Sequence, residues 1–407
     1  MSEDADIVVV GAGLAGLRAA QVLNNSGLRV ILLDRDNHVG GRLASRTVSG
    51  FTLDRGFQLI NPSYPELVAT GVLKDFDLRR FPAVVRFTDG RNIHEIGDPR
   101  GDPRRLVSSL RHPDVSFNDA VKFAFMMSIL RVSSARTILK GPDFTLHEAL
   151  LRNRFSPDFI ESILTPFLRG PLLDNELVTS WHYSALVLKS FTQGRPGTHP
   201  QGIAALPRAL EQSLSATQVR LGENVIRVAS TRVETERNHY HARAVIVATD
   251  APSARKLVGV SDTAWRAQTT WWLSLPRQHV ASQLRIDTGR GFLSNLLNVS
   301  SVAHERAATG RSLVAANANG EFNSGEDNDV RADVSRIYEV GKNEIELIDR
   351  DVVPHALPDV VIPLNLRRAQ VHRDVIVAGD YLQTPSIQGA LVSGRRAAHI
   401  TLRRLNL

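Results

Sequence analysis

Three glycines near the start of the chain have the spacing of a phosphate-binding turn. Gly11, Gly13 and Gly16 follow a short apolar run, DIVVV, and precede a helical stretch that is expected to stop near Gly27. In this pattern the first glycine permits a tight turn, the second lets the backbone approach a pyrophosphate, and the third lets helix and strand pack closely. The start of the helix offers free N–H groups and a positive dipole end to the phosphates.

An acidic residue completes this pattern. The run Leu28–Leu33, LRVILL, predicts a second buried strand, and it is followed by Asp34, whose carboxylate can accept hydrogen bonds from ribose hydroxyls. Strand, glycine turn, helix, strand and acid occur in the expected order, so the context makes the motif specific. The sequence therefore predicts a dinucleotide site that also includes Leu14 and Ala15 at the start of the helix.

Two segments after this unit resemble motifs of the flavin-containing amine oxidase and phytoene desaturase superfamily. The first is RDNHVGGR, residues 35–42, and the second is DRGFQ, residues 54–58. In that superfamily the glycine pair passes close to the cofactor, the arginine sits near its pyrophosphate, and the second segment passes along the flavin. The resemblance thus implies seven further cofactor-binding residues: Arg35, Gly40, Gly41, Arg42, Gly56, Phe57 and Gln58.

The C-terminal stretch VAGDYLQTPSIQGALVSGRRAA, residues 377–398, resembles a second motif of the same superfamily. There the Gly-Asp pair places its carboxylate on the ribityl chain of FAD, and the next helix points its N-terminus at the N1/C2=O side of the flavin. Reduced flavin carries negative charge at that side, so the helix dipole stabilises it. Gly389 and Ala390 are expected to leave room for the ring. The resemblance adds Gly379, Asp380, Ser386, Ile387, Gln388 and Ala390 to the predicted site.

A middle segment, residues 224–250, supplies the last predicted contacts. Its runs NVIRV and YHARAVIVAT predict strands. The resemblance implies that Val225 gives backbone contacts to adenine, and that Ala248 and Thr249 form a small-residue turn near the dinucleotide. The motifs at the two ends of the chain make sense together only if one extended cofactor, FAD, spans them.

These segments predict an α/β fold. A discontinuous, Rossmann-like FAD-binding domain is expected from residues 1–75, 200–258 and 345–407, and an inserted, mixed α+β substrate domain from residues 76–199 and 259–344. A chain of 407 residues is long enough for two such domains.

The sequence favours hydride transfer between flavin N5 and a hydrophobic small molecule, with oxygen or another electron acceptor closing the cycle. Amine oxidases of this superfamily often carry an aromatic residue where this chain has Ser386, and a lysine in the strand that here reads TTWWLSLPR. The final helix is more similar to plant-type phytoene desaturases and their bacterial relatives, which favours a desaturase-like or saturase-like enzyme.

A flavin amine oxidase producing hydrogen peroxide, acting on an amine substrate, is one alternative. A non-catalytic flavin-binding partner protein is another, and no catalytic acid or base is identified.

Composition excludes several kinds of site. The chain has no cysteine, so disulfides, thiolate catalysis, cysteine-type metal sites and cysteinyl attachment of FAD are excluded, and FAD is expected to bind non-covalently. The net charge is +7, but the basic residues are dispersed, so no nucleic-acid partner is predicted, and no metal site either.

No apolar run is long enough to span a bilayer, and the acidic start MSEDADIVVV is not a signal peptide, so a cytoplasmic protein is expected. One predicted helix, residues 116–140, is apolar on more than one side. Burial in the substrate domain is the preferred interpretation of this helix, with contact to a membrane surface as the alternative. The sequence gives no indication of oligomeric state.

Overall fold

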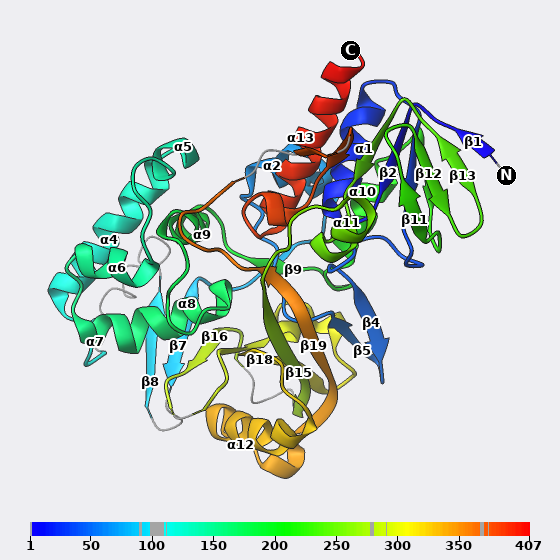
Figure 1. Ribbon diagram of the computed structural model, residues 1–407. Helices are drawn as coiled ribbons and strands as arrows, with labels where there is room; N and C mark the ends of the chain where they lie inside the picture. Colours follow the sequence, from blue (N-terminus) through cyan, green and yellow to red (C-terminus); the bar gives the residue numbers. More distant parts are fainter. Residues whose placement is uncertain are drawn as a thin grey trace.

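The protein consists of a first lobe, which contains both ends of the chain, and a larger second lobe, and two long strands, β15 and β19, run between them (Figure 1). This computed structural model describes residues 2–88, 92–97, 110, 112–276, 281–289, 291–366, 370–372 and 374–407. The α/β architecture expected from the sequence is confirmed.

A six-stranded sheet forms the centre of the first lobe. In order across the sheet its strands are β10 (Thr217–Arg220), β3 (Val30–Leu33), β2 (Ile7–Val10), β14 (Ala244–Val247), β21 (Val375–Val377) and β20 (Gln370–His372). All neighbours are parallel except β20, which runs antiparallel to β21. Because carboxyl ends of parallel strands share one edge, the loops that follow β2, β3, β14 and β21 meet there.

Helices cover one face of this sheet and a smaller sheet covers the other. The helices are α1 (Leu14–Asn25), α2 (Pro65–Ala69), α10 (Ala205–Gln212) and α13 (Ile387–Arg404). The smaller sheet contains β1 (Ser2–Asp4), β13 (His239–His241), β12 (Arg232–Thr235) and β11 (Val225–Val228), with α11 (Ala251–Val258) beside it. Side chains of β2 alternate between the two cores: Ile7 and Val9 join the helical core, whereas Val8 and Val10 join the other.

Helices α1 and α13 lie side by side, although their residues come from opposite ends of the chain (Figure 1). Gly394 of α13 makes this approach possible, since a Cβ atom on it would lie 2.1 Å from the carbonyl oxygen of Ala15. The helix pair therefore holds the two terminal segments against the same sheet.

The second lobe is built on a seven-stranded sheet. In order, its strands are β19 (Glu346–Pro358), β15 (Trp265–Pro276), β18 (Arg311–Asn319), β17 (Asn295–Asn298), β16 (Leu284–Asp287), β7 (Val84–Thr88) and β8 (Ile93–Gly97). Helix α12 (Asp327–Tyr338) packs on one face through a shared apolar cluster. Two short strand pairs complete the sheets: β4 (Ser45–Val48) with β5 (Phe51–Asp54), and β6 (Arg79–Arg80) with β9 (Gly197–Thr198).

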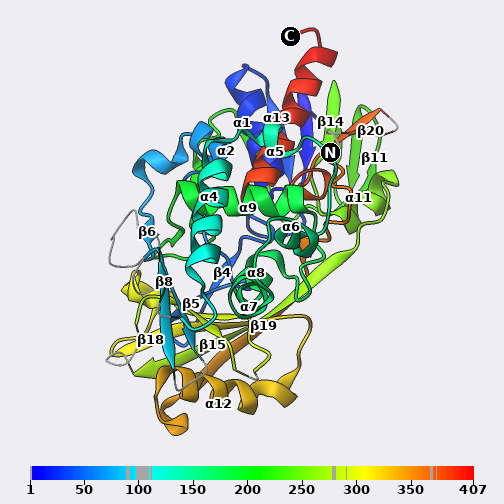
Figure 2. The same ribbon diagram turned by 90° about the vertical axis from the view of Figure 1, so that its left-hand side faces the viewer.

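A helical group packs beside β7 and β16. It contains α4 (Phe117–Val132), α5 (Ala135–Ile138), α6 (Leu146–Arg152), α7 (Pro157–Phe159), α8 (Thr165–Leu172) and α9 (Trp181–Gln193). In Figure 2, α4 stands in front of α9, which crosses behind it.

Two details differ from the sequence analysis. The helix expected over residues 116–140 is divided at Ser133 and Ser134, because the side chain of Ser134 accepts the N–H of Thr137 and starts a separate helix, α5. Strand β19 pairs with β15 along its length, so residues 346–358 lie in the second lobe's sheet. We therefore propose a domain boundary after Pro358 in place of residue 345.

Replacing Gly394 by alanine tests the close packing of α1 and α13. The added methyl group must displace the backbone at Ala15, so we expect the free energy of unfolding to fall by about 1–3 kcal/mol, despite the better helix propensity of alanine. Urea denaturation measures the change. His399→Ala, at an exposed position of the same helix, should stay within about 0.5 kcal/mol of the parent. Unchanged or increased stability of Gly394→Ala would contradict the contact.

Candidate cofactor and substrate site

One cavity of about 1560 Å³ runs from the first lobe into the second lobe. Its lining comes from the loops at the carboxyl edge of the six-stranded sheet, from strands β15 and β19, and from helices α4 and α9. Ligand sites commonly lie at such an edge and between domains, so this cavity is the candidate site.

The glycine turn after β2 lines the cavity in the first lobe, at the end where the sequence predicts the nucleotide. Gly11 has a φ of +104°, which glycine adopts without strain. A Cβ atom on Gly13 would have no neighbour within 4 Å, so open space lies above it. Helix α1 begins there without a side-chain cap, which leaves its first N–H groups free for an anion. A Cβ on Gly16 would meet the carbonyl oxygen of Gly11 at 1.8 Å, as expected for a packing glycine.

Asp34 lies beside this turn, at the end of β3. Its Oδ2 accepts the N–H of Ala12 at 2.6 Å, and its Oδ1 accepts the N–H of Asp36 at 2.9 Å. Burial raises the pKa of the Asp34 carboxyl, while these two hydrogen bonds act in the opposite direction. The side chain is therefore fixed at the wall of the cavity, with acceptor capacity left for a ribose hydroxyl.

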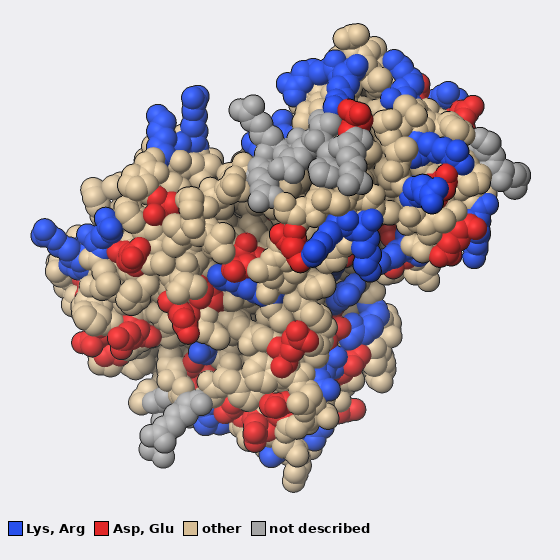
Figure 3. Space-filling model, in the orientation of Figure 1, with Lys and Arg blue, Asp and Glu red and all other residues tan. Residues whose placement is uncertain are grey.

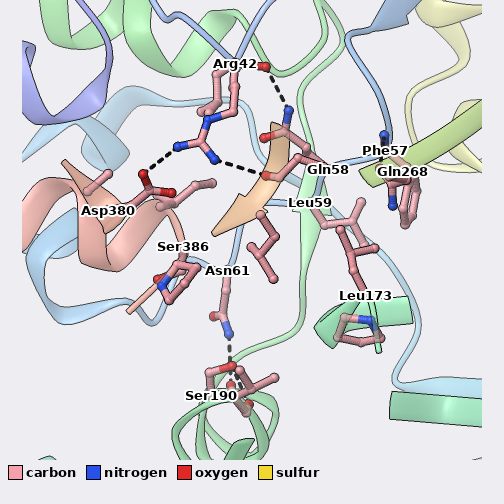
Figure 4. Close-up of a pocket in the computed structure, with 18 of the residues that line it drawn as sticks. Arg42, Phe57, Gln58, Leu59, Asn61, Leu173, Ser190, Gln268, Asp380 and Ser386 are labelled. Carbon is pink, nitrogen blue, oxygen red and sulfur yellow. Dashed lines mark hydrogen bonds and ion pairs between the residues drawn. The ribbon is translucent and has the colours of Figure 1, made fainter. Parts of the chain in front are cut away.

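An ion pair joins the N-terminal and C-terminal segments (Figure 4). Arg42 Nη2 lies 2.6 Å from Oδ1 of Asp380, and Arg42 Nη1 donates to the carbonyl oxygen of Ala356 at 3.0 Å. Gln58 donates from Nε2 to the carbonyl oxygen of Arg42 at 2.9 Å. Arg42 also lies over the ring of Trp265, 5.5 Å from its centre. These contacts hold the predicted motifs at one place in the cavity.

The first turn of α13 faces the cavity with small residues. Ser386 caps the helix, since its Oγ accepts the N–H of Gly389 at 3.0 Å, and Ile387 and Ala390 line the cavity. Glycine at position 389 was expected to leave room for the flavin ring, but the structure requires it for another contact: a Cβ atom there would lie 1.8 Å from the carbonyl oxygen of Thr384. It is needed for the preceding turn, whereas the space beside the cavity comes from Ala390.

Most of the predicted cofactor residues line this single cavity. They are Gly11, Gly13, Leu14, Ala15, Asp34, Arg35, Gly40, Gly41, Arg42, Phe57, Gln58, Val225, Ala248, Thr249, Gly379, Asp380, Ser386, Ile387 and Ala390.

Three predicted residues lie outside the lining: Gly16, Gly56 and Gln388. Gly16 supports the turn from behind. Gly56 has a φ of +70° and turns the chain against Val353 and Gln268. Gln388 points to α2, where its Oε1 accepts the N–H of Glu66 at 2.9 Å.

Several polar residues of the cavity were not predicted. Tyr183 of α9 donates from its hydroxyl to the carbonyl oxygen of Pro385 at 2.8 Å, and Gln268 accepts the N–H of Phe57 at 3.2 Å. The indole N–H of Trp265 is buried in the cavity wall and has no partner among the described residues. Glu223 follows β10 at the same sheet edge as Asp34, which the sequence could have indicated.

His355 lines the cavity, and its ring lies against that of Trp265 with centres 5.0 Å apart, whereas three other histidines lie outside the lining. His182 lies against Asp143, His199 against Phe76, and His304 is exposed beside Glu305. Trp271 and Trp272, two of the three tryptophans of β15, are fully buried outside the cavity.

Polarity is sorted along the cavity. In the described part of the chain, its carboxylates follow the parallel strands at the nucleotide end, and they are Asp34, Asp36, Glu223, Asp250 and Asp380. The part near α4, α8 and α9 has an apolar lining, which includes Phe81, Phe87, Phe123, Met127, Phe159, Ile163, Phe167 and Phe191. Over the described ranges, no cluster of three metal-ligating side chains occurs, and no helix is long and apolar enough to cross a bilayer.

The arrangement fits an elongated dinucleotide such as FAD. An uncapped helix and open glycine turn face the phosphate position, an acid faces the ribose position, and a second helix N-terminus faces the far end.

Comparison with known proteins shows the family of this chain and proteins of similar fold. The sequence model for "Flavin containing amine oxidoreductase" matches residues 14–401. Putrescine oxidase of Kocuria rosea is 39% identical over 93 residues, which is 23% of this chain and 18% of that protein. A 4,4'-diapolycopene oxygenase of Methylomonas is 40% identical over 70 residues, covering 17% of this chain and 14% of that protein. Both matches thus span less than a fifth of the relatives' length.

Solved structures match over nearly the whole chain. An oxidoreductase from Methanosarcina mazei has a TM-score of 0.74 and 16% identity, covering 97% of this chain and 99% of that one. At this identity the likeness describes the fold alone.

Replacing Asp34 tests the ribose end of the site. In Asp34→Asn one carboxylate oxygen becomes an NH₂ group facing a backbone N–H, so we expect FAD affinity to fall about 10–100-fold. Flavin fluorescence titration of the FAD-free protein measures the affinity. Asp36→Asn removes the same charge from a neighbouring carboxylate, whose side chain is 41% exposed at the cavity wall, and should change affinity less. Equal losses in both variants would reduce the effect to net charge.

Acidification gives an independent test of the same carboxylate. Burial holds the pKa of Asp34 above its ordinary value of 3.8, and the charged form is the acceptor for a ribose hydroxyl. The stabilisation that FAD adds should therefore be complete at neutral pH and be lost as the pH falls through that raised pKa. The difference in Tm between FAD-loaded and FAD-free protein measures it. A difference that grows on acidification would contradict this role.

Proposed function

Since the chain belongs to the flavin containing amine oxidoreductase family, we propose that it binds FAD non-covalently and transfers a hydride between a hydrophobic small molecule and flavin N5. Family membership makes the protein a flavin oxidoreductase, which argues against the alternative of a non-catalytic flavin-binding partner. The direction of transfer and the final acceptor, oxygen or another oxidant, follow from the substrate and not from the fold.

The distribution of charge in the cavity carries the substrate proposal. The carboxylates among its described lining residues follow strands of the six-stranded sheet, where the cofactor's ribose and phosphates are expected. The remaining space is lined mainly by aromatic and aliphatic side chains from α4, α8 and α9, and the polar side chains that these helices add, Ser128, Arg131, Ser190 and Thr192, include no carboxylate. Removing an ammonium ion from water is costly unless a counter-charge replaces the lost hydration. An uncharged, apolar molecule meets no such penalty in this space.

The chain's own residues would orient the reactants and exclude water. When bound, FAD supplies the redox chemistry of the flavin ring. The N-terminus of α13 supports negative charge at the end of the cavity that Ile387 and Ala390 line. The apolar walls keep water away from the transferred hydride.

Tyr183 lies in the cavity as a neutral donor and not as a base. Its hydroxyl is committed to the carbonyl oxygen of Pro385, and burial raises the pKa of its phenol well above the ordinary value. This bond ties α9 to the residue before the cap of α13. We assign Tyr183 a positioning role at the junction of the two lobes.

The second candidate function is amine oxidation with formation of hydrogen peroxide. The similarity to putrescine oxidase over 93 residues favours it. Tyr64 and Tyr183 also line the cavity and offer aromatic surfaces to a cation. Against it, Ser386 stands where an aromatic residue is common in such oxidases, and its hydroxyl serves as a helix cap.

An anaerobic flavin-reduction screen tests the two functions. Purified FAD-loaded protein is mixed separately with polyenes, other apolar hydrogen donors, amines and NAD(P)H, and the visible flavin band is followed. We expect bleaching by an apolar donor and none by amines, because the substrate space has no counter-charge for an ammonium ion. If the enzyme runs as a saturase, the dithionite-reduced protein should be reoxidised by an apolar acceptor.

Dithionite reduction of the same sample is the control for a competent flavin. Bleaching by an amine, followed by peroxide formation on admitting oxygen, would establish the second candidate instead. A flavin that dithionite reduces but that responds to no apolar donor or acceptor would remove the proposed substrate class.

A further inference from the structure

Helix α4 carries an exposed apolar stripe along its outer side. Phe117, Val121, Phe125, Ile129 and Val132 are 71%, 51%, 67%, 46% and 83% exposed. Their spacing of four and three residues places them on one face of the helix. Large apolar side chains normally avoid such exposure as a contiguous group, so the stripe indicates a contact surface.

The other sides of α4 belong to the protein interior and the cavity. Met126 and Leu130 are buried in the helical core, and Phe123 and Met127 line the cavity. One helix thus separates the apolar cavity from the apolar outer stripe, which is why the sequence of α4 is apolar on more than one side.

The cavity reaches the surface beside this stripe. Ala124, Ser128, Arg131 and Val132 all line the cavity and are all exposed. Val132 belongs to both the stripe and the cavity lining. An opening at this place would meet whatever covers the outer side of α4.

Positive charge lies at the C-terminal end of the stripe. Arg131, Arg136 and Lys140 are exposed there. Within residues 116–140 the acid is Asp119, which is buried and accepts hydrogen bonds from Ser116 and Ser156. Figure 3 shows Lys and Arg projecting from the upper and outer edges of the lobe that carries α4, with Asp and Glu set between and below them.

We propose that α4 and α5 dock this protein on an anionic lipid surface, with the stripe in the boundary of the acyl chains and the cations at the level of the phosphates. An amphipathic helix with an apolar face and basic neighbours binds such a surface in two ways: its apolar side chains are buried among the acyl chains, and its cations are attracted to the anionic headgroups. The cavity opening then faces the lipid. As far as it concerns the substrate, this inference rests on the proposed function: an apolar molecule dissolved in the bilayer enters the cavity without crossing water.

Lipid explains the stripe better than a second copy of the chain. A copy packed on α4 would cover the opening beside Ala124 and Ser128, whereas lipid supplies the apolar medium that a hydrophobic substrate comes from. The basic residues at one end of the stripe match anionic headgroups directly.

Vesicle sedimentation tests the docking without any need for turnover. FAD-loaded protein is mixed with phosphatidylcholine vesicles that contain or lack phosphatidylglycerol. We expect binding that increases with phosphatidylglycerol and weakens with added salt. The double variant Phe117→Ser/Phe125→Ser should bind at least about tenfold more weakly, since neither side chain supports the core.

Two matched variants separate the contributions. Arg136→Gln/Lys140→Gln should lose about tenfold or more of the binding to phosphatidylglycerol vesicles and little of the binding to phosphatidylcholine. Val68→Ser/Val361→Ser removes two exposed apolar side chains from other surfaces and should bind like the parent.

Absence of parent binding, or equal binding by Phe117→Ser/Phe125→Ser, would overturn the proposal. So would a parent dimer in gel filtration that this variant converts to a monomer, which would assign the stripe to a second copy. Reduction of the flavin by a water-soluble donor should be unchanged in the same variant. Docking and chemistry are therefore read separately, and the failure of one does not imply the failure of the other.

Discussion

The structure depends on one constraint: strands from the two ends of the chain must lie in one parallel sheet. Strand β14 lies between β2 and β21, and α1 packs on α13 across the face of that sheet. Because parallel strands end at a common edge, the glycine turn after β2 and the acid after β21 then meet. The ion pair between Arg42 and Asp380, with Nη2 and Oδ1 2.6 Å apart, then holds the N-terminal and C-terminal segments together at this edge. The candidate cofactor site thus forms because the two ends of the chain lie in the same sheet.

The parts of the site that end a strand could be predicted from sequence. Asp34 and Asp380 follow short buried runs, and the spacing of the glycines between a strand and a helix predicts a dinucleotide-binding turn. Gln388 and Gly389 could not be assigned in this way, since the direction in which a first-turn residue points depends on how α13 packs on α2 and on the turn at Thr384. The sequence does not indicate the pairing of β19 with β15, because it is a long-range contact, and this pairing is the reason for the domain boundary proposed after Pro358.

Helix α4 shows a second limit of sequence reasoning. A pattern that is apolar on two sides predicts burial on both, because the sequence does not distinguish a core face from a face exposed to another medium. In the structure one apolar side of α4 lines a cavity, and the neighbouring apolar side is exposed. Composition was compatible with both interpretations, and only the three-dimensional packing of Met126 and Leu130 identifies the inner side.

The same separation of polarity governs the cavity. Its charged end is built by loops after parallel strands, where helix starts leave backbone N–H groups unpaired and where this sequence places its carboxylates. Its apolar end is built by helix sides and strand faces, whose backbone groups are already paired, so side chains alone set its character. A cofactor that is polar at one end and planar and less polar at the other suits a cavity made this way. Reaction at the junction would therefore take place where the protein changes from hydrogen-bonding walls to dry ones, near the tie between Tyr183 and Pro385.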